Sequence, residues 1–331
     1  MSYHIPTDDT PAPPGQTRSL PPPTSTGKVE FTVPSTGEKG VTIYRIWGSL
    51  SSSNTPLICL HGGPGMLHNY ILPICLIHSD FGIPVIMYDQ LGCGDNTHFP
   101  HYKGDESFWT IELHLAELEN LKSHLGITEF FLLGQSCGGM QAVQYAADHQ
   151  PAGLKKLVIS NSPASMSTWT KVCGGLRSAL PDEVQKILDK HEKDGTTDSA
   201  EYEKATHVFY QRHLCRVKPF PAELEASLAG VSADNTVYVT MNGPSEFTVI
   251  GSLKDWDYVN RLSKITSNTV PGGVLLINGC FDEAQDDVVW PYFNLIEAKT
   301  KWIQFALSSH CPFLEETDAY VKALGEFLLA G

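Results

Sequence analysis

One short segment of the sequence combines a serine with the glycines that a sharply turned nucleophile requires. The pattern G-x-S-x-G spans residues 134–138, directly after the apolar run FFLL and before the helix-forming segment MQAVQYAADH. In a strand–turn–helix arrangement the strand delivers the serine to a tight turn, and the flanking glycines let the backbone approach its neighbours closely. The segment therefore predicts that Ser136 is a nucleophile for acyl transfer. Cys137, the adjacent thiol, is a rival nucleophile, but in such a turn only the central residue is raised toward a substrate.

A second glycine-rich loop could stabilise the oxyanion that forms when a serine attacks a carbonyl carbon. The loop is HGGPG at 61–65, directly after the apolar run PLICL. An oxyanion requires two preorganised N–H donors. One is normally the amide of the residue after the nucleophile, here Cys137, and a loop of this type supplies the other, here Gly63. We expect His61 to brace the backbone of the loop rather than to act as a base.

Serine is a weak nucleophile until a general base takes its proton, and the base must itself be held by an acid. In chain order the acid follows the serine and the histidine comes last. Asp282 lies where the apolar run GVLLING ends, and His310 lies in the loop after the run KWIQFAL, as the last of 13 histidines. Asp286 and Asp287 are alternatives for the acid, but they lie closer to the next helix. We predict that Asp282 and His310 complete a triad with Ser136.

The segments that must position these residues alternate between short apolar runs and segments with helical periodicity. The apolar runs, typical of buried parallel strands, are PLICL (56–60), PVIMYD (84–89), FFLLG (130–134), KKLVIS (155–160) and GVLLING (273–279). Between them, residues 108–124 carry leucines at helical spacing, and residues 140–149 form a second helical segment that ends before Pro151. Strands separated by helices of this length predict βαβ units in a mostly parallel sheet. KVEFTV and VTIYRIWG, at 28–33 and 41–48, predict a hairpin that opens the sheet.

Three stretches of different composition suggest the domain organisation. Residues 1–27 contain PAPPG and PPP with few large apolar residues, and we interpret them as an irregular proline-rich arm. Residues 163–252 are rich in helix formers and charges and lack buried-strand runs, so we predict a helical cap over the carboxyl edge of the sheet. The remaining ranges, 28–162 and 253–331, form the predicted α/β core.

Composition and charge exclude several other classes of protein. The chain has 331 residues, 41% of them hydrophobic, which fits one large globular domain with an insertion. Its formal net charge of −14 disfavours nucleic acid and anionic membrane surfaces as partners. The eight cysteines lie far apart, without the spacing of a zinc site or a dense disulfide framework. No apolar stretch approaches the roughly 18 residues of a membrane span, and no signal peptide is evident. We therefore expect a cytoplasmic protein without a metal or an organic cofactor.

These motifs, together with several others, resemble those of the proline iminopeptidase (prolyl aminopeptidase) group of α/β hydrolases, which includes related L-amino-acid amidases. The resemblance extends from about residue 28 to the C-terminus and rests on HGGPG (61–65), YDQLGCG (88–94), GQSCGG (134–139), MNGPSEF (241–247), LKDWD (253–257), FDE (281–283) and SSH (308–310). HGGPG and MNGPSEF together are the specific part, because lipases and esterases share the serine motif. The resemblance implies an α/β-hydrolase fold, with a mostly parallel central sheet flanked by helices and a helical cap insertion.

The resemblance also implies a site for the free α-amine of a substrate. In the family, carboxylates hold this amine, and the matching residues are Glu246, in MNGPSEF, and Glu283, which follows the predicted triad aspartate. An ammonium group in a covered pocket needs paired negative charge, because its loss of hydration otherwise opposes binding. Two departures from the family pattern bear on which acyl residue the enzyme prefers, including proline itself. Cys137 replaces an aromatic residue after the nucleophile, and residues 95–97 (DNT) replace a segment that often contains an arginine.

We therefore predict a serine hydrolase that cleaves an N-terminal aminoacyl bond of a small peptide or aminoacyl substrate through an acyl-serine intermediate. The same residues could instead serve an L-amino-acid amidase, an esterase or a hydrolase of a biosynthetic peptide or thioester. A hydrolase fold retained as a non-catalytic ligand-binding module is the alternative of a different class, since fold does not fix function. Such modules typically lose a triad residue, and none is missing here.

Overall fold

An eight-stranded sheet collects the predicted site residues along one edge. The computed structural model describes residues 3–50 and 54–331. The strands are β1 (Ser25–Thr32), β2 (Lys39–Trp47), β3 (Leu57–Leu60), β4 (Val85–Tyr88), β5 (Phe130–Gln135), β6 (Leu154–Ser160), β7 (Val274–Gly279) and β8 (Thr300–Phe305). Their order in the sheet is β1-β2-β4-β3-β5-β6-β7-β8. Strand β2 runs antiparallel to both of its neighbours, and the other neighbouring pairs are parallel.

The central strands are apolar on both faces because helices cover both faces of the sheet. In β3, Leu57 and Cys59 face one hydrophobic core while Ile58 and Leu60 face the other, since successive side chains of a strand point to opposite sides. Helices packed on the Ile58 side are α2 (Ile111–His124), α3 (Cys137–Gln144) and α9 (Asp286–Leu295), and those on the Leu57 side are α1 (Leu76–Phe81) and α11 (Thr317–Leu329). This arrangement explains the uninterrupted apolar runs of the sequence.

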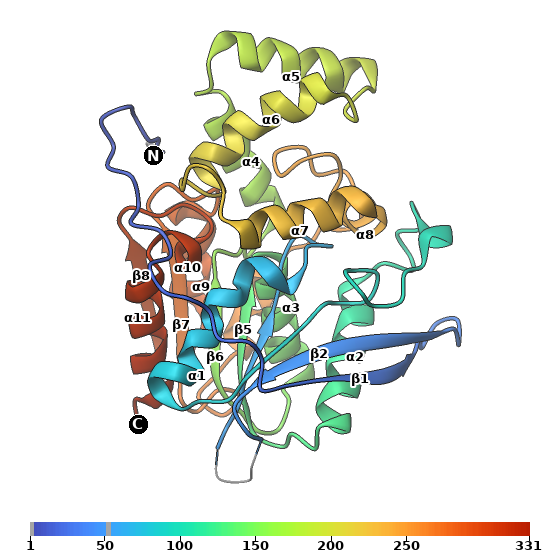
Figure 1. Ribbon diagram of the computed structural model, residues 1–331, viewed down its shortest axis with the longest axis vertical. Coiled ribbons are helices and arrows are strands. Elements are labelled where there is room, and N and C mark those ends of the chain that lie inside the picture. The colour runs from blue at the N-terminus through green and yellow to red at the C-terminus, as the bar shows by residue number, and fades with distance from the viewer. Residues whose placement is uncertain (1–2, 51–53) are drawn as a thin grey trace.

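Between β6 and β7 the chain leaves the sheet and forms helices above its carboxyl edge (Figure 1). These helices are α4 (Met166–Arg177), α5 (Asp182–Asp194), α6 (Ala200–His213), α7 (Ala222–Ala233) and α8 (Thr236–Met241). Local sequence sets their ends: Gly195 closes α5 with φ 69°, and the Ser199 side chain accepts the N–H of Tyr202 to begin α6. Figure 1 shows α5 and α6 farther from the sheet than α7.

Short helices complete the loops at both ends of the strands. They are the 3₁₀ helices η1 (His68–Cys75), η2 (Pro100–Tyr102) and η4 (Val259–Lys264), the π-helical turn η3 (Tyr145–His149) and the α-helix α10 (Pro312–Glu315). Helix α10 directly follows the loop that carries His310, and η1 follows the HGGPG loop, so both short helices lie next to predicted site residues.

Residues 3–24 contain no helix or strand and lie along the outside of the core (Figure 1). Several contacts hold them there. The N–H of Gly15 donates to the carbonyl oxygen of Glu315 at 2.7 Å, and the indole of Trp47 donates to the carbonyl oxygen of Pro21 at 2.9 Å. Arg18 pairs with Asp80 and with Asp318. The first two residues of the predicted arm, 1 and 2, lie outside the described residues.

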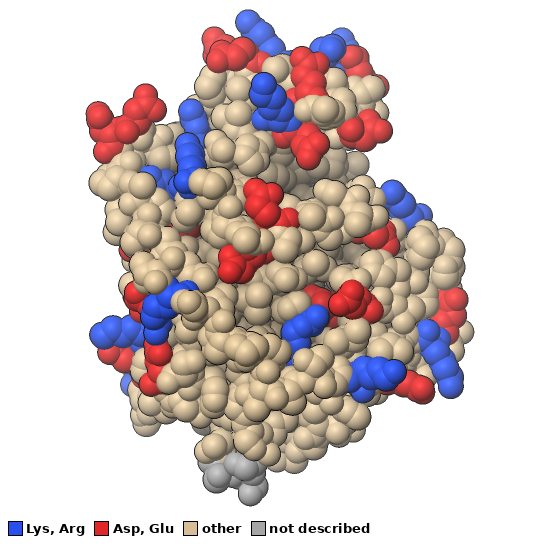
Figure 2. Space-filling model, viewed as in Figure 1, with Lys and Arg blue, Asp and Glu red and all other residues tan. Residues whose placement is uncertain are grey.

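The surface drawn in Figure 2 mixes acidic and basic side chains without an extended patch of one sign. Among the helices of residues 3–50 and 54–331, none is both long and apolar enough to cross a membrane.

Candidate active site

Ser136 lies at a sharp turn between β5 and α3. Its backbone has φ 54° and ψ −123°, a positive φ that non-glycine residues rarely adopt. The residues two positions before and after it must be glycines: a Cβ atom on Gly134 would lie 2.1 Å from the carbonyl oxygen of Gly138, and one on Gly138 would lie 2.3 Å from that of Leu60. The turn therefore presents Ser136 at the carboxyl edge of β5, in the wall of a cavity.

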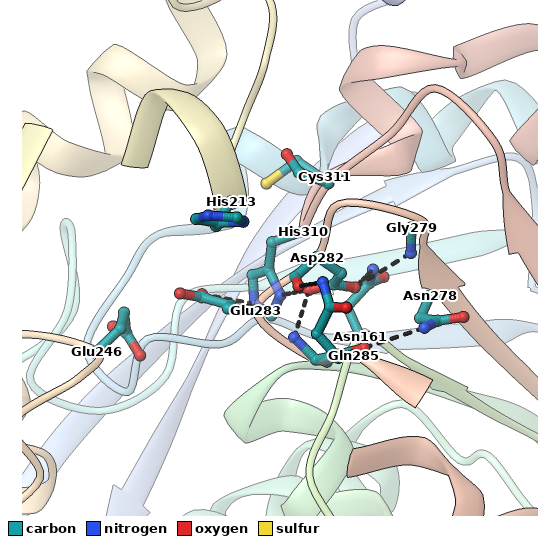
Figure 3. A network of polar contacts seen from close by, with 12 residues as sticks. Asn161, His213, Glu246, Asn278, Gly279, Asp282, Glu283, Gln285, His310 and Cys311 are labelled. Atoms are coloured by element: carbon teal, nitrogen blue, oxygen red, sulfur yellow. Dashed lines mark hydrogen bonds and ion pairs between the residues drawn. The ribbon is translucent and has the colours of Figure 1, made fainter. Parts of the chain in front are cut away.

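The loops after β7 and β8 bring Asp282 and His310 together. The Nδ1 atom of His310 lies 2.7 Å from Oδ1 of Asp282, and both side chains are almost fully buried (Figure 3). Asp282 also accepts hydrogen bonds from the backbone N–H groups of Ala284, at 2.8 Å, and Gly279, at 3.2 Å, and from Nδ2 of Asn161. The carboxylate is thus fixed in place. Because it can only accept a hydrogen bond, Nδ1 of His310 carries the hydrogen, and Nε2 is left able to accept a proton.

The alternative acids, Asp286 and Asp287, belong to the first turn of α9. Asp286 accepts a hydrogen bond from Nε2 of Gln304. Asp282 is the acid of this loop that faces Nδ1 of the imidazole.

Ser136 and His310 line the same cavity. Among the described residues, no hydrogen bond joins the Ser136 hydroxyl to the imidazole, whose Nε2 atom lies 3.6 Å from Oε1 of Glu283. Catalytic hydrogen bonds are often long in ligand-free sites and shorten when a substrate binds. The structure thus places the predicted base in the cavity of the predicted nucleophile, with no hydrogen-bond donor on its acceptor nitrogen.

The loop after β3 presents an unused backbone donor to this cavity. The carbonyl oxygen of Gly62 accepts hydrogen bonds from Nδ1 of His61, at 3.0 Å, and from the backbone N–H of Met66, at 3.3 Å. The C=O of Gly62 and the N–H of Gly63 belong to one trans peptide unit and point in opposite directions. The N–H of Gly63 therefore points away from His61 Nδ1 and from the N–H of Met66. No hydrogen bond among the described residues uses this N–H or that of Cys137, the first residue of α3. Two free donors therefore flank the serine.

His61 braces this loop and is not positioned as a base. Its Nε2 accepts the backbone N–H of Gln90 at 2.9 Å while its Nδ1 donates to Gly62, so the ring is neutral. Burial lowers the pKa of His61 to about 4, which keeps the ring neutral at physiological pH. The side chain is fully buried, so its role is to hold the loop.

Two carboxylates, Glu246 and Glu283, line the same cavity on the side of the imidazole away from Asp282 (Figure 3). Glu283 is 1% exposed, and its Oε2 atom has no hydrogen-bond partner in the part of the chain that the structure describes. Glu246 accepts a hydrogen bond from the Tyr238 hydroxyl at 2.8 Å. Burial, reinforced by the charges of Glu246 and Asp282, raises the pKa of Glu283 well above its usual range, and burial also raises the pKa of Glu246. The raised pKa values favour the protonated form of these groups in the buried cavity. A cationic ligand group would favour their charged form and would give the free oxygen of Glu283 a partner.

The cavity lies between the core and the helices above the sheet, with a volume of about 250 Å³. One part of its wall carries the polar groups described above. Another part is aliphatic, formed by cap residues that are all nonpolar: Leu214, Leu224, Leu228 and Val231. A ligand with a charged end and an apolar end matches this division.

Comparison with known proteins identifies the family. The model of the α/β hydrolase fold family matches residues 55–317. The chain is 36% identical over 287 residues to a proline iminopeptidase of Clostridium botulinum, covering 87% of this chain and 94% of that relative. It is also 36% identical over 290 residues to a proline iminopeptidase of Saccharolobus solfataricus, covering 87% of this chain and 89% of that relative. The chain belongs to the proline iminopeptidase family. This assignment confirms the predicted family, the α/β-hydrolase fold and the prediction of a hydrolase.

Two solved structures are similar to this chain over most of its length. The crystal structure of VinJ is 42% identical, with a TM-score of 0.86, and the match covers 93% of this chain and 99% of VinJ. The crystal structure of a proline iminopeptidase from Mycobacterium smegmatis is 40% identical, with a TM-score of 0.79, and the match covers 91% of this chain and 97% of that one.

Cys137 directly follows Ser136 at the start of α3. Its side chain is 2% exposed and, with Met140, Trp169 and Leu253, lines a small recess beside Ser136. Burial raises the pKa of the Cys137 thiol to about 12, so the thiol is protonated at neutral pH and is a poor nucleophile. The structure therefore argues against Cys137 as the rival nucleophile.

Asn161 is a site residue that the sequence analysis missed. It directly follows β6, adopts φ 54° and donates from Nδ2 to Oδ2 of Asp282. An asparagine at the carboxyl end of a parallel strand was the available signal, because residues there meet at the same edge of the sheet. Asparagine also tolerates a positive φ better than most residues.

Tyr70 and Gln135 are two further site residues that the sequence analysis missed. The Tyr70 hydroxyl accepts the backbone N–H of Gly62 at 2.6 Å and donates to Oε1 of Gln135. Nε2 of Gln135 donates to the carbonyl oxygen of His310 at 3.2 Å. One continuous chain of hydrogen bonds therefore connects the oxyanion loop, the serine turn and the histidine loop.

In residues 3–50 and 54–331, no group of three or more His, Cys, Asp or Glu side chains is arranged to hold a metal ion. The eight cysteines are free thiols.

Proposed function

We propose that the protein is an aminopeptidase that hydrolyses the bond after an N-terminal aminoacyl residue through an acyl-serine intermediate. One observation carries the proposal: Glu283, with a buried and unpartnered oxygen, lines the cavity of Ser136 and His310 beside a second carboxylate, Glu246. The free α-ammonium of a substrate would give this oxygen its missing partner. The similarity to proline iminopeptidases supports the same activity.

Each site residue has a defined role in this proposal. His310 takes the proton of Ser136 through Nε2 while the serine oxygen attacks the carbonyl carbon. The resulting oxyanion accepts hydrogen bonds from the N–H groups of Gly63 and Cys137. As the intermediate collapses, the bond to the leaving group breaks and the leaving group takes the proton from His310. Water then attacks the acyl-serine with the same proton transfers, while Asp282 holds the imidazole throughout.

We also propose a division of labour between parts of the chain. Residues 28–162 and 253–331 form the catalytic core, and residues 163–252 form a cap that supplies Glu246 and the aliphatic wall of the cavity. The described part of the arm, residues 3–24, lies on the outside of the core; the predicted end of the arm at residue 27 is wrong by three residues, because residues 25–27 already pair with β2 as the start of β1. The aliphatic wall would contact an apolar leaving group.

Eight free thiols without a disulfide fit a reducing compartment, and on this basis we propose a cytoplasmic location.

A substrate panel tests the activity. Prolyl, alanyl and leucyl naphthylamides would be compared with L-amino-acid amides, simple acyl esters and aminoacyl thioesters. We expect turnover of the aminoacyl naphthylamides. Turnover of simple acyl esters alone would contradict the proposal and favour an esterase. A fluorophosphonate probe should label the wild-type protein and not Ser136→Ala, whereas an unlabelled wild type would favour a non-catalytic module.

A further inference from the structure

One cap residue, His213, contacts both loops that carry the proposed acid and base. It is the last residue of α6. Its carbonyl oxygen accepts the backbone N–H of His310 at 3.2 Å, and its Nδ1 atom lies 2.9 Å from the carbonyl oxygen of Phe281, the residue before Asp282. Figure 3 shows the ring at the end of a cap helix beside His310.

The imidazole of His213 makes its hydrogen bond through one nitrogen only. A carbonyl oxygen can only accept, so Nδ1 carries a hydrogen and donates it to Phe281. The other nitrogen, Nε2, is buried without a hydrogen-bond partner among the described residues. Burial lowers the pKa of His213 to about 4, so the ring is neutral at physiological pH. A buried polar atom left unpaired has a free-energy cost.

A second cap residue three positions later strengthens the same attachment. The backbone N–H of Arg216 donates to Oε1 of Glu315 at 2.8 Å, and its guanidinium lies 4.4 Å from the centre of the Phe281 ring. Oε2 of Glu315 accepts the backbone N–H groups of Ser309, at 2.8 Å, and Cys311, at 3.2 Å. These two residues flank His310. Residues 213–216 therefore attach the cap to the acid loop and the base loop at once.

We propose that His213 is a positioning residue that sets the separation of Asp282 and His310 through its Nδ1–H bond to Phe281. The proposal rests on the proposed function, because it assumes that these two residues carry the proton transfers of Ser136. Proton transfer is sensitive to small displacements, and about 1 Å of misplacement can reduce a rate by about 100-fold.

Two substitutions distinguish the role of the Nδ1 donor of His213 from that of the rest of its side chain. In His213→Asn the side-chain amide lies near the position of Nδ1, whereas in His213→Gln it reaches the position of Nε2. We expect His213→Asn to keep kcat near the wild-type value. We expect His213→Gln to lower kcat about 10- to 100-fold, the range that small displacements of catalytic groups produce, with little change in KM.

His191→Gln is the matched control. His191 is another buried cap histidine, but it contacts Thr196, Ser199 and Glu201, all within the cap. The His191→Gln variant should have a lower thermal unfolding midpoint than the wild type. The rate at which a fluorophosphonate labels Ser136 should not change. That labelling rate should fall in His213→Gln and not in His213→Asn.

Equal rates for His213→Gln and wild type, or an equal loss in His213→Asn and His213→Gln, would overturn the proposal. If His213→Gln does not fold, His213→Asn decides alone, since a loss of rate in that folded variant would also overturn it. A failure of the proposed function looks different, because the wild-type protein itself would then neither label nor turn over aminoacyl substrates.

Discussion

Glu283 and His310 face each other across 3.6 Å, measured from the carboxylate Oε1 to the imidazole Nε2. The preceding residue, Asp282, lies 2.7 Å from the opposite nitrogen of the same ring. Two adjacent acidic residues thus approach the two nitrogens of one imidazole. In the proposed mechanism Asp282 holds the base. Glu283 holds the substrate ammonium close to Nε2 of His310, the atom that receives the serine proton.

Removing either carboxylate charge should weaken substrate binding. For Glu283→Gln and Glu246→Gln we expect a rise in KM of about 10- to 100-fold for aminoacyl naphthylamides, since a charge-assisted hydrogen bond contributes about 1.5 to 3 kcal/mol. Steady-state kinetics at pH 8 measures this, with circular dichroism as the control for folding. An unchanged KM in both variants would mean that neither carboxylate binds the amine.

The raised pKa of Glu283 also predicts a pH-dependent cost to stability. A carboxyl group whose pKa is higher in the folded state than in the unfolded state binds its proton more tightly when folded. Its stabilising contribution is therefore present at low pH and is lost as the pH rises through the folded-state pKa. Glu283→Gln, which removes the charge, should be more stable than the wild type at pH 8.5, by a few degrees in Tm.

For scale, about 1 kcal/mol moves Tm by about 2 to 4 °C in domains of about 150 to 250 residues, and the shift is smaller in larger domains. Thermal unfolding at pH 5.5 and pH 8.5 compares the two proteins. The advantage of Glu283→Gln should grow with pH, and an advantage that is constant or shrinks with pH would contradict the assignment of a raised pKa.

The hydrogen-bond chain through Tyr70 and Gln135 should act as a unit. Tyr70→Phe leaves the N–H of Gly62 and Oε1 of Gln135 without the partner that they share. We expect kcat to fall about tenfold, which corresponds to about 1.4 kcal/mol in the activation barrier, with KM unchanged. Gln135→Met interrupts the same chain, so the double variant should lose little more than either single variant. Additive losses would show that the two side chains act separately.

The buried thiol of Cys137 should take no part in the reaction. Because its pKa is raised to about 12, iodoacetamide at pH 8 should leave Cys137 unmodified and the activity intact. Peptide mapping by mass spectrometry locates any alkylation, which we expect only at the partly exposed Cys280. Cys137→Ala should keep its activity, whereas Ser136→Ala should lose on the order of 10⁶-fold in kcat. Inactivation that maps to Cys137 would reverse the two roles.

The sequence contained enough information to place the serine turn and the sheet around it. The glycines at 134 and 138 are required by contacts within a few residues or with the adjacent strand, so a local motif reports them. Asp282 and His310 were also accessible, because the carboxyl ends of parallel strands share one edge. The family resemblance supplied Glu246 and Glu283, which composition and spacing alone could not distinguish from surface carboxylates.

The supporting residues were not accessible from sequence because their partners are distant and often backbone atoms. Tyr70 bonds Gln135 across 65 positions, and His213 bonds the carbonyl of Phe281 across 68. A carbonyl oxygen leaves no trace in the residue type that carries it, so no pattern marks the pair. The path of the N-terminal arm could not be predicted for the same reason, since one contact that holds the arm is the hydrogen bond from Trp47 to the carbonyl oxygen of Pro21.

The most direct test compares one substrate with and without its positive charge. The wild-type protein would be assayed on an aminoacyl naphthylamide and on its N-acetylated form, which keeps the scissile bond and removes the ammonium. We predict that kcat/KM falls by at least about 100-fold on acetylation, because two carboxylates lose their ionic partner. Equal values of kcat/KM for the two substrates would contradict the claim that Glu246 and Glu283 select a free amine.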